Sequence, residues 1–140
     1  MDNKQGHGSG FAIKNIILTE SSFTRINNVI FKDAETAISI NVNVSVEGKN
    51  IIVEETVDVV HKLQEIEQMK MRVKMVGIFE VIGESQLTDL QEFGRINGAA
   101  IIFPYIREHI TNVSQKGGMG TIILPPVNFT KIDNNGTSQQ

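Results

Sequence analysis

The chain has 140 residues, enough for one domain with a hydrophobic core. Its hydrophobic content of 40% and charged content of 21% are typical of globular proteins, and its net charge of −3 argues against a nucleic-acid binder, because phosphate contacts need a basic surface. The absence of cysteine excludes disulfides and thiolate chemistry and fits a reducing compartment.

Both ends of the chain are polar and rich in glycine or asparagine. We predict disordered tails at residues 1–10 and 133–140, around one domain of residues 11–132. The first ten residues lack the apolar stretch of a signal peptide, and no run of eighteen apolar residues occurs that could insert into a membrane. A cytoplasmic protein is the expectation.

Four segments have the composition or the alternation of strands, and a turn sequence at residues 47–50 joins the second to the third. They are residues 11–25, 37–46, 51–61 and 69–82. Helical patterns come only after the fourth strand. The pattern predicts an α+β fold in which a four-stranded antiparallel meander is covered by helices on one face, with the other face open.

Charges alternate with apolar residues in the last two strands. Glu54 and Asp58 share one face of the third strand, while Glu55 is a polar exception in the valine row of the other face. Lys70 and Arg72 share one face of the fourth strand. Antiparallel pairing would place acidic and basic residues opposite one another, so a solvated sheet face is the simplest structural interpretation.

The other face of the fourth strand carries an apolar row that is rich in methionine. Its members are Met69, Met71, Val73 and Met75. Methionine fills irregular gaps in cores and is also common at adaptable protein contacts. Composition alone leaves core and subunit contact equally open.

Two helices are expected after the strands. Ser85 is predicted to cap a short helix over residues 86–96, and Asn97-Gly98 is predicted to end it. The second helix begins near Ala99, with Pro104 in its first turn or at a kink. Its apolar stripe consists of Ile102 or Phe103, Ile106, Ile110 and Val113.

No group of residues has the spacing of a catalytic or metal site. Glu108 and His109 are adjacent on a helix, where they point about 100° apart. A helical zinc site would need a second histidine four residues away, and Tyr105 and Val113 occupy those positions. We therefore predict a protein that is not an enzyme and has no cofactor and no metal.

Three separated motifs point to one family. Residues 101–108, IIFPYIRE, are similar to its Leu-Phe-Pro-Tyr-x-Arg-Glu helix, and residues 124–129, LPPVNF, are similar to its Leu-x-Pro-Val-Asn-Phe segment. Residues 77–79, GIF, are similar to the Gly-Ile-Phe at the end of its last strand. On these motifs the chain resembles the SecB family of protein-export chaperones over residues 11–132.

The resemblance implies a four-stranded antiparallel sheet with a long helix, assembled as a dimer of dimers. It implies ATP-independent binding of unfolded preproteins in long apolar grooves. The residues that match the groove are Ile38, Ile40, Val42, Phe103, Tyr105 and Ile106. The row that matches the subunit contact of the homotetramer is Met69, Met71, Val73 and Met75, which moves the interpretation of the methionines toward assembly.

In the family an acidic sheet face docks the translocation ATPase SecA. The corresponding positions here are Glu20, Thr24, Lys70 and Arg72. Lys70 and Arg72 stand where the family has leucine and glutamate, so the charge is reversed, and a partner that docks through basic residues would be repelled there. The alternative function is a SecB-like chaperone dedicated to one specific protein partner, such as an antitoxin.

Overall fold

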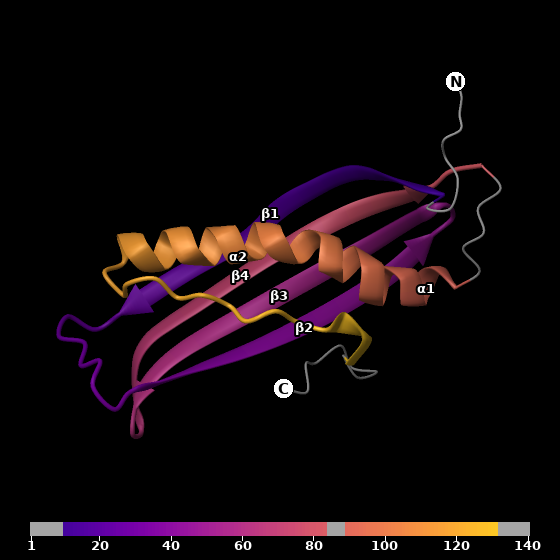
Figure 1. Cartoon of the computed structure of the whole chain (residues 1–140). Coiled ribbons are helices and arrows are strands. Elements are labelled where there is room, and N and C mark those ends of the chain that lie inside the picture. The colour runs from indigo at the N-terminus through magenta and orange to yellow at the C-terminus, as the bar shows by residue number, and fades with distance from the viewer. Residues whose placement is uncertain (1–9, 84–88, 132–140) are drawn as a thin grey trace.

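The computed structural model describes residues 10–83 and 89–131. The predicted tails, apart from Gly10, and the predicted cap at Ser85 lie outside these ranges. Within them, one sheet carries a single layer of helix on one of its faces (Figure 1). None of the helices in these ranges is long and apolar enough to cross a membrane.

The sheet has four antiparallel strands, as the alternation predicted. They are β1 (Phe11–Arg25), β2 (Glu35–Glu47), β3 (Asn50–Leu63) and β4 (Ile66–Val81). Their order in the sheet is β1-β4-β3-β2. The prediction of a simple four-stranded meander was therefore wrong for β1, which pairs with the last strand instead of the second.

A loop over residues 26–34 makes this arrangement possible, because it carries the chain from β1 at one edge of the sheet to β2 at the other. The side chain of Gln68, on β4, holds the loop through two hydrogen bonds to the backbone of Ile30. Its Oε1 accepts a hydrogen bond from the Ile30 backbone nitrogen at 2.8 Å, and its Nε2 donates one to the Ile30 carbonyl at 2.8 Å. A long-range connection of this kind leaves little trace in local sequence patterns.

The helical part is continuous from α1 (Leu90–Phe93) through the π-helical η1 (Gly94–Gly98) into α2 (Ala99–Lys116). The predicted break at Asn97-Gly98 was therefore wrong. Gly98 serves close packing instead, because a Cβ atom there would lie 2.8 Å from Val53 Cγ2. Asp89 caps α1 by accepting a hydrogen bond from the Glu92 backbone nitrogen at 3.0 Å.

The hydrophobic core lies between α2 and the sheet face beneath it. Pro104 is inside α2, beyond the first turn that one predicted alternative gave it, and it is exposed. The helix buries Ile102, Phe103, Ile106 and Ile110, which confirms the predicted stripe except for the half-buried Val113. After α2, residues 119–129, which we call the strap, run back across the sheet beside α2 (Figure 1). The strap has no helix or strand structure up to residue 128, and its last residue begins the short 3-10 helix η2 (Phe129–Lys131).

Candidate functional site

The side of β2 that faces the helix layer carries three of the residues predicted for a peptide-binding groove. Ile38 is half-buried, whereas Ile40 and Val42 are buried. The strand alternates, so these three side chains share one face. In the pairing with β3, Ile40 lies opposite Val57 and Val42 lies opposite Glu55. These cross-strand pairs form the floor of the candidate site.

Helix α2 supplies one wall of this site. Phe103 and Ile106 are three residues apart, so both point from α2 toward the sheet, and both are buried. The Phe103 ring meets the ring of Phe129 edge to face, with centroids 5.6 Å apart. The structure therefore brings five of the six predicted groove residues into one region. Tyr105 is not among them, because it lies on the outer side of α2 and is 52% exposed.

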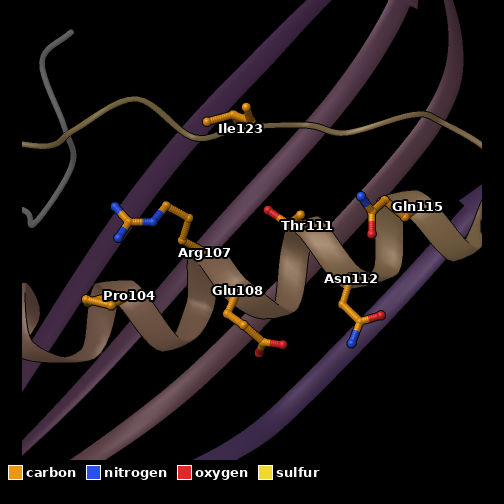
Figure 2. A pocket seen from close by; sticks show the side chains of 7 residues that line it. All are labelled: Pro104, Arg107, Glu108, Thr111, Asn112, Gln115 and Ile123. Carbon is orange, nitrogen blue, oxygen red and sulfur yellow. The ribbon is translucent and has the colours of Figure 1, made fainter.

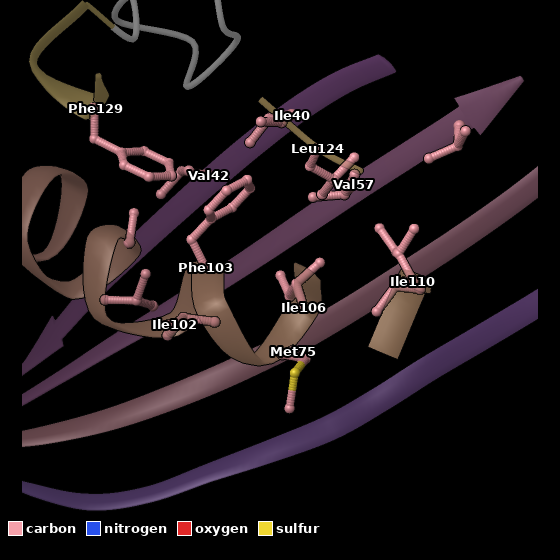
Figure 3. Packing of buried hydrophobic residues seen from close by; sticks show 14 of the residues in the cluster. Ile40, Val42, Val57, Met75, Ile102, Phe103, Ile106, Ile110, Leu124 and Phe129 are labelled. Carbon is pink, nitrogen blue, oxygen red and sulfur yellow. The ribbon is translucent and has the colours of Figure 1, made fainter. Parts of the chain in front are cut away.

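The strap covers the floor, so the site is closed in this chain. Its side chains Met119, Leu124 and Phe129 are buried in the same core cluster as the floor residues. Figure 3 shows Leu124 near Ile40 and Val57, and Phe129 beside Phe103 and Val42. The predicted groove is thus filled by the chain's own apolar side chains.

Glu55 is a site residue that the sequence reasoning noted as an exception and did not use. Its side chain is fully buried, and neither carboxylate oxygen has a hydrogen-bond partner in the described ranges. Burial raises the pKa of this carboxyl well above its ordinary value, because a charge is poorly solvated there. The sequence feature that could have pointed to this site was the single acidic residue in the valine row of β3.

The row predicted as a subunit contact is core within one chain. Met69, Met71 and Val73 are at most 3% exposed, and Met75 is 9% exposed. They face α2 from β4, and Figure 3 shows Met75 among the buried cluster. Side chains that are already covered have little surface to offer a second subunit, so a role in assembly stays a prediction for this row.

The four positions that match the SecA-docking face lie together on the opposite, open face of the sheet. Thr24 pairs with Lys70, while Glu20 pairs with Lys74. A shallow pocket on this face is lined by Glu20, Thr24, Lys70 and Arg72 among others. The sequence therefore predicted correctly that these side chains share a face, and their function as a docking site stays a prediction.

Ion pairs neutralise much of the charge on this open face. Arg72 Nε donates to Asp58 Oδ1 at 2.7 Å, and its second contact reaches Asp58 Oδ2 at 3.3 Å. This side-chain hydrogen bond and the charge of Asp58 raise the pKa of Arg72. Lys74 Nζ lies 3.7 Å from carboxylate oxygens of both Glu20 and Glu54. The predicted cross-strand pairing of acidic and basic residues is confirmed.

A second depression lies on the outer side of α2, between the helix and the strap. It is lined by Pro104, Arg107, Glu108, Thr111, Asn112, Gln115 and Ile123. Figure 2 shows Arg107 and Glu108 pointing in different directions from the helix, so they do not form one charged site. The Arg107 guanidinium carbon lies 5.7 Å from the centre of the Phe103 ring. No catalytic arrangement of side chains is present in this depression.

Exposed apolar side chains gather at two further places. On the loop between β1 and β2, Ile30 and Phe31 are each 54% exposed. On β1, which forms one edge of the sheet, Ile13 and Leu18 are 50% and 43% exposed. Apolar side chains along a sheet edge are typical of contact surfaces.

Comparison with known proteins gives a consistent family. A family model described as "Preprotein translocase subunit SecB" matches residues 4–140. The protein-export protein SecB of Hahella chejuensis is 28% identical over 130 residues, which is 87% of this chain and 79% of that protein. The uncharacterized protein MJ0357 of Methanocaldococcus jannaschii is 38% identical over 58 residues, which is 41% of this chain and 37% of that protein.

A solved structure shares the fold. It is the Mycobacterium tuberculosis Rv1957 SecB-like chaperone in complex with a ChAD peptide from the Rv1956 HigA1 antitoxin. Its TM-score to this chain is 0.71 at 13% sequence identity, and the match covers 85% of this chain and 92% of that chain. At this identity the likeness establishes the fold.

Proposed function

Because the chain belongs to the SecB family, whose members are chaperones for protein export and not enzymes, we propose that it is an ATP-independent holdase. It binds unfolded preproteins in the cytoplasm, and residues 11–132 act as its functional domain. The observation that carries the proposal is the apolar floor of Ile38, Ile40 and Val42. Part of the cover over this floor is the strap, which is buried against it and is not part of the sheet.

Binding is driven by the burial of apolar client side chains. Each Å² of apolar surface removed from water contributes roughly 25 cal/mol, so a few leucine-sized side chains suffice for useful affinity. The half-buried Ile38 and the exposed Ile30 and Phe31 offer such surface without any rearrangement. A chaperone that works by burial alone needs no nucleotide.

The test is light scattering from an aggregating client protein without ATP. We expect suppression at stoichiometric amounts and no change when ATP is added. Ile38→Asp should weaken suppression because it places a charge on the floor. Ser39→Asp is the matched control, because Ser39 is exposed and points to the other face of β2. Aggregation that proceeds unchanged at an excess of the wild-type protein would contradict the proposal.

We also propose that the chain assembles as a homotetramer, a dimer of dimers. The supporting observation is the sheet edge formed by β1, where Ile13, Ile17 and Leu18 are between 39% and 50% exposed. The molar mass in solution tests this. We expect Leu18→Asp to lower the mass, and the neighbouring Thr19→Asp to leave it unchanged. A wild-type mass of one 15.5 kDa chain would refute assembly.

A chaperone dedicated to one protein, such as an antitoxin, is the second candidate. Two observations favour it: the reversed charge at Lys70 and Arg72, and the antitoxin peptide bound by the structurally similar Rv1957. A pull-down that returns a single partner would support this candidate, and a broad mixture of clients would support the general holdase. A SecA binding titration addresses the open face directly, because repulsion at Lys70 and Arg72 predicts weak binding.

A further inference from the structure

Glu55 is an acidic residue buried among the apolar side chains of the core. It lies on β3 between Val53 and Val57, which are both fully buried, and its cross-strand partners are Val42 on β2 and Met75 on β4. Both of its carboxylate oxygens lack a hydrogen-bond partner in the described ranges. An unpaired buried carboxyl destabilises a fold, so its presence calls for a partner that residues 10–83 and 89–131 do not supply.

The position of Glu55 coincides with the floor of the client site. Glu55 is paired with Val42, and the next cross-strand pair on the same face is Ile40 with Val57. On the covered side of these pairs lie Phe103 of α2 and Leu124 and Phe129 of the strap (Figure 3). The cross-strand neighbours of Glu55 thus belong to the floor that the helix and the strap cover.

The strap is attached more weakly than the elements around it. Its first residues are tied to α2, by the Met119 nitrogen donating to the Ser114 carbonyl at 2.9 Å and by the Ile122 nitrogen donating to Ser114 Oγ at 3.4 Å. Residues 123–127 have no hydrogen bond to another described residue. Buried side chains alone hold this part, and such segments open at a lower free energy than hydrogen-bonded strands.

The strap makes no hydrogen bond to Glu55. The two residues that follow the anchor Leu124 are Pro125 and Pro126, which have no backbone N–H to donate. Arg107, a cation on the adjoining turn of α2, has its guanidinium carbon 5.7 Å from the centre of the Phe103 ring and makes no hydrogen bond to Glu55. The strap thus supplies two apolar anchors five positions apart. Of the four residues between them, Pro125 and Pro126 have no backbone N–H, and Val127 and Asn128 make no hydrogen bond to Glu55.

We propose that Glu55 is a specificity-determining residue of the client site: it accepts hydrogen bonds from a lysine or arginine of an extended client segment that displaces the strap. This inference rests on the proposed holdase function. The client segment places two apolar side chains where Leu124 and Phe129 now lie and a cationic side chain between them. A charge-assisted hydrogen bond in a site that excludes water is stronger than one between neutral groups, so the preference is for a cation.

Two fluorescent ten-residue peptides test the role of Glu55. Both carry leucine and phenylalanine five positions apart, and between these anchors one has lysine and the other norleucine. Wild-type protein should bind the lysine peptide about tenfold more tightly. In Glu55→Leu this ratio should fall to within about twofold, because the side chain no longer offers an acceptor to the lysine, and Glu55→Gln, which keeps a neutral acceptor, should give an intermediate ratio. Glu54→Gln, on the open face of the same strand, should keep the wild-type ratio.

The outcomes separate this inference from the function on which it rests. If wild type binds both peptides equally, or if Glu55→Leu keeps the preference, the role of Glu55 is refuted while the holdase function stands. If wild type binds neither peptide, both proposals fail. Displacement of the strap is tested by Leu124→Ala, which should tighten binding of both peptides several-fold, with the exposed Ile123→Ala as the unchanged control. Weaker binding by Leu124→Ala would overturn displacement.

Discussion

Two carboxylates on β3, three residues apart, show how differently the two faces of the sheet treat a charge. Asp58 is on the open face, where Arg72 holds it with contacts of 2.7 and 3.3 Å. Glu55 is on the helix-covered face, where it is fully buried and neither oxygen has a hydrogen-bond partner in the described ranges. On the open face a charged side chain costs little free energy, because water and flexible cationic side chains solvate it. On the covered face the same charge needs a specific partner, and such a partner points toward function.

The largest effect should come from a new charge on the covered face. Met71→Asp buries an unpaired carboxylate, and we expect it to lose about 3–5 kcal/mol or to prevent folding. Lys70→Asp, the next residue on the open face, should change stability by less than about 1 kcal/mol. Urea unfolding at a fixed protein concentration measures both. A folded Met71→Asp protein of lower molar mass would instead support the subunit contact predicted for this row.

Removing the carboxyl that is already on the covered face should change stability with the opposite sign. Glu55→Leu replaces an unsatisfied carboxyl with an apolar side chain, so the unfolding free energy at pH 7 should rise by roughly 1–3 kcal/mol. Glu54→Leu on the open face is the control, because Glu54 is half-buried and lies 3.7 Å from Lys74. It should shift stability by no more than about 0.5 kcal/mol. A destabilised Glu55→Leu would mean that the carboxyl has a partner within the chain.

The pH dependence of stability should differ between the same two proteins. The raised pKa means that folded Glu55 keeps its proton to a higher pH than it does in the unfolded chain. Folded wild type therefore binds more protons above the unfolded pKa of about 4.3, and this residue's contribution falls as the pH rises toward the folded pKa, by at most about 1.4 kcal/mol per pH unit.

Urea unfolding of wild type and Glu55→Leu across this pH range isolates the effect, because all other groups are shared. The advantage of Glu55→Leu should be small near pH 4 and should grow as the pH is raised. Parallel stability curves would show that Glu55 titrates alike in the folded and unfolded states.

The smallest effect should come from breaking the ion pair on the open face. Arg72→Ala removes the partner of Asp58, but Asp58 remains in contact with water, so the expected loss of unfolding free energy is the smallest of this series. In 1 M salt the difference from wild type should shrink further, since the Debye length is only about 3 Å there. A loss as large as that of Met71→Asp would show that the two faces are not as different as the burial implies.

The sequence by itself determined the local elements and the family. The first strand begins and ends where its composition predicted, at Phe11 and Arg25, and α2 begins at Ala99. The alternation in β3 and β4 also predicted which residues share a face, including the row with the exceptional Glu55. These properties follow from periods of two and 3.6 residues, which are local and can be read along the chain.

Only the tertiary structure decided what covers each face. It placed β1 beside β4, turned Tyr105 outward and laid the strap over the predicted groove. It also made Gly98 a close contact with Val53 where the sequence predicted a helix end. The period of a strand separates its two sides but does not say which side meets a helix, because that depends on contacts between segments far apart in the chain. For that reason only the folded molecule shows that Glu55 is buried and that no described residue forms a hydrogen bond with its carboxylate oxygens.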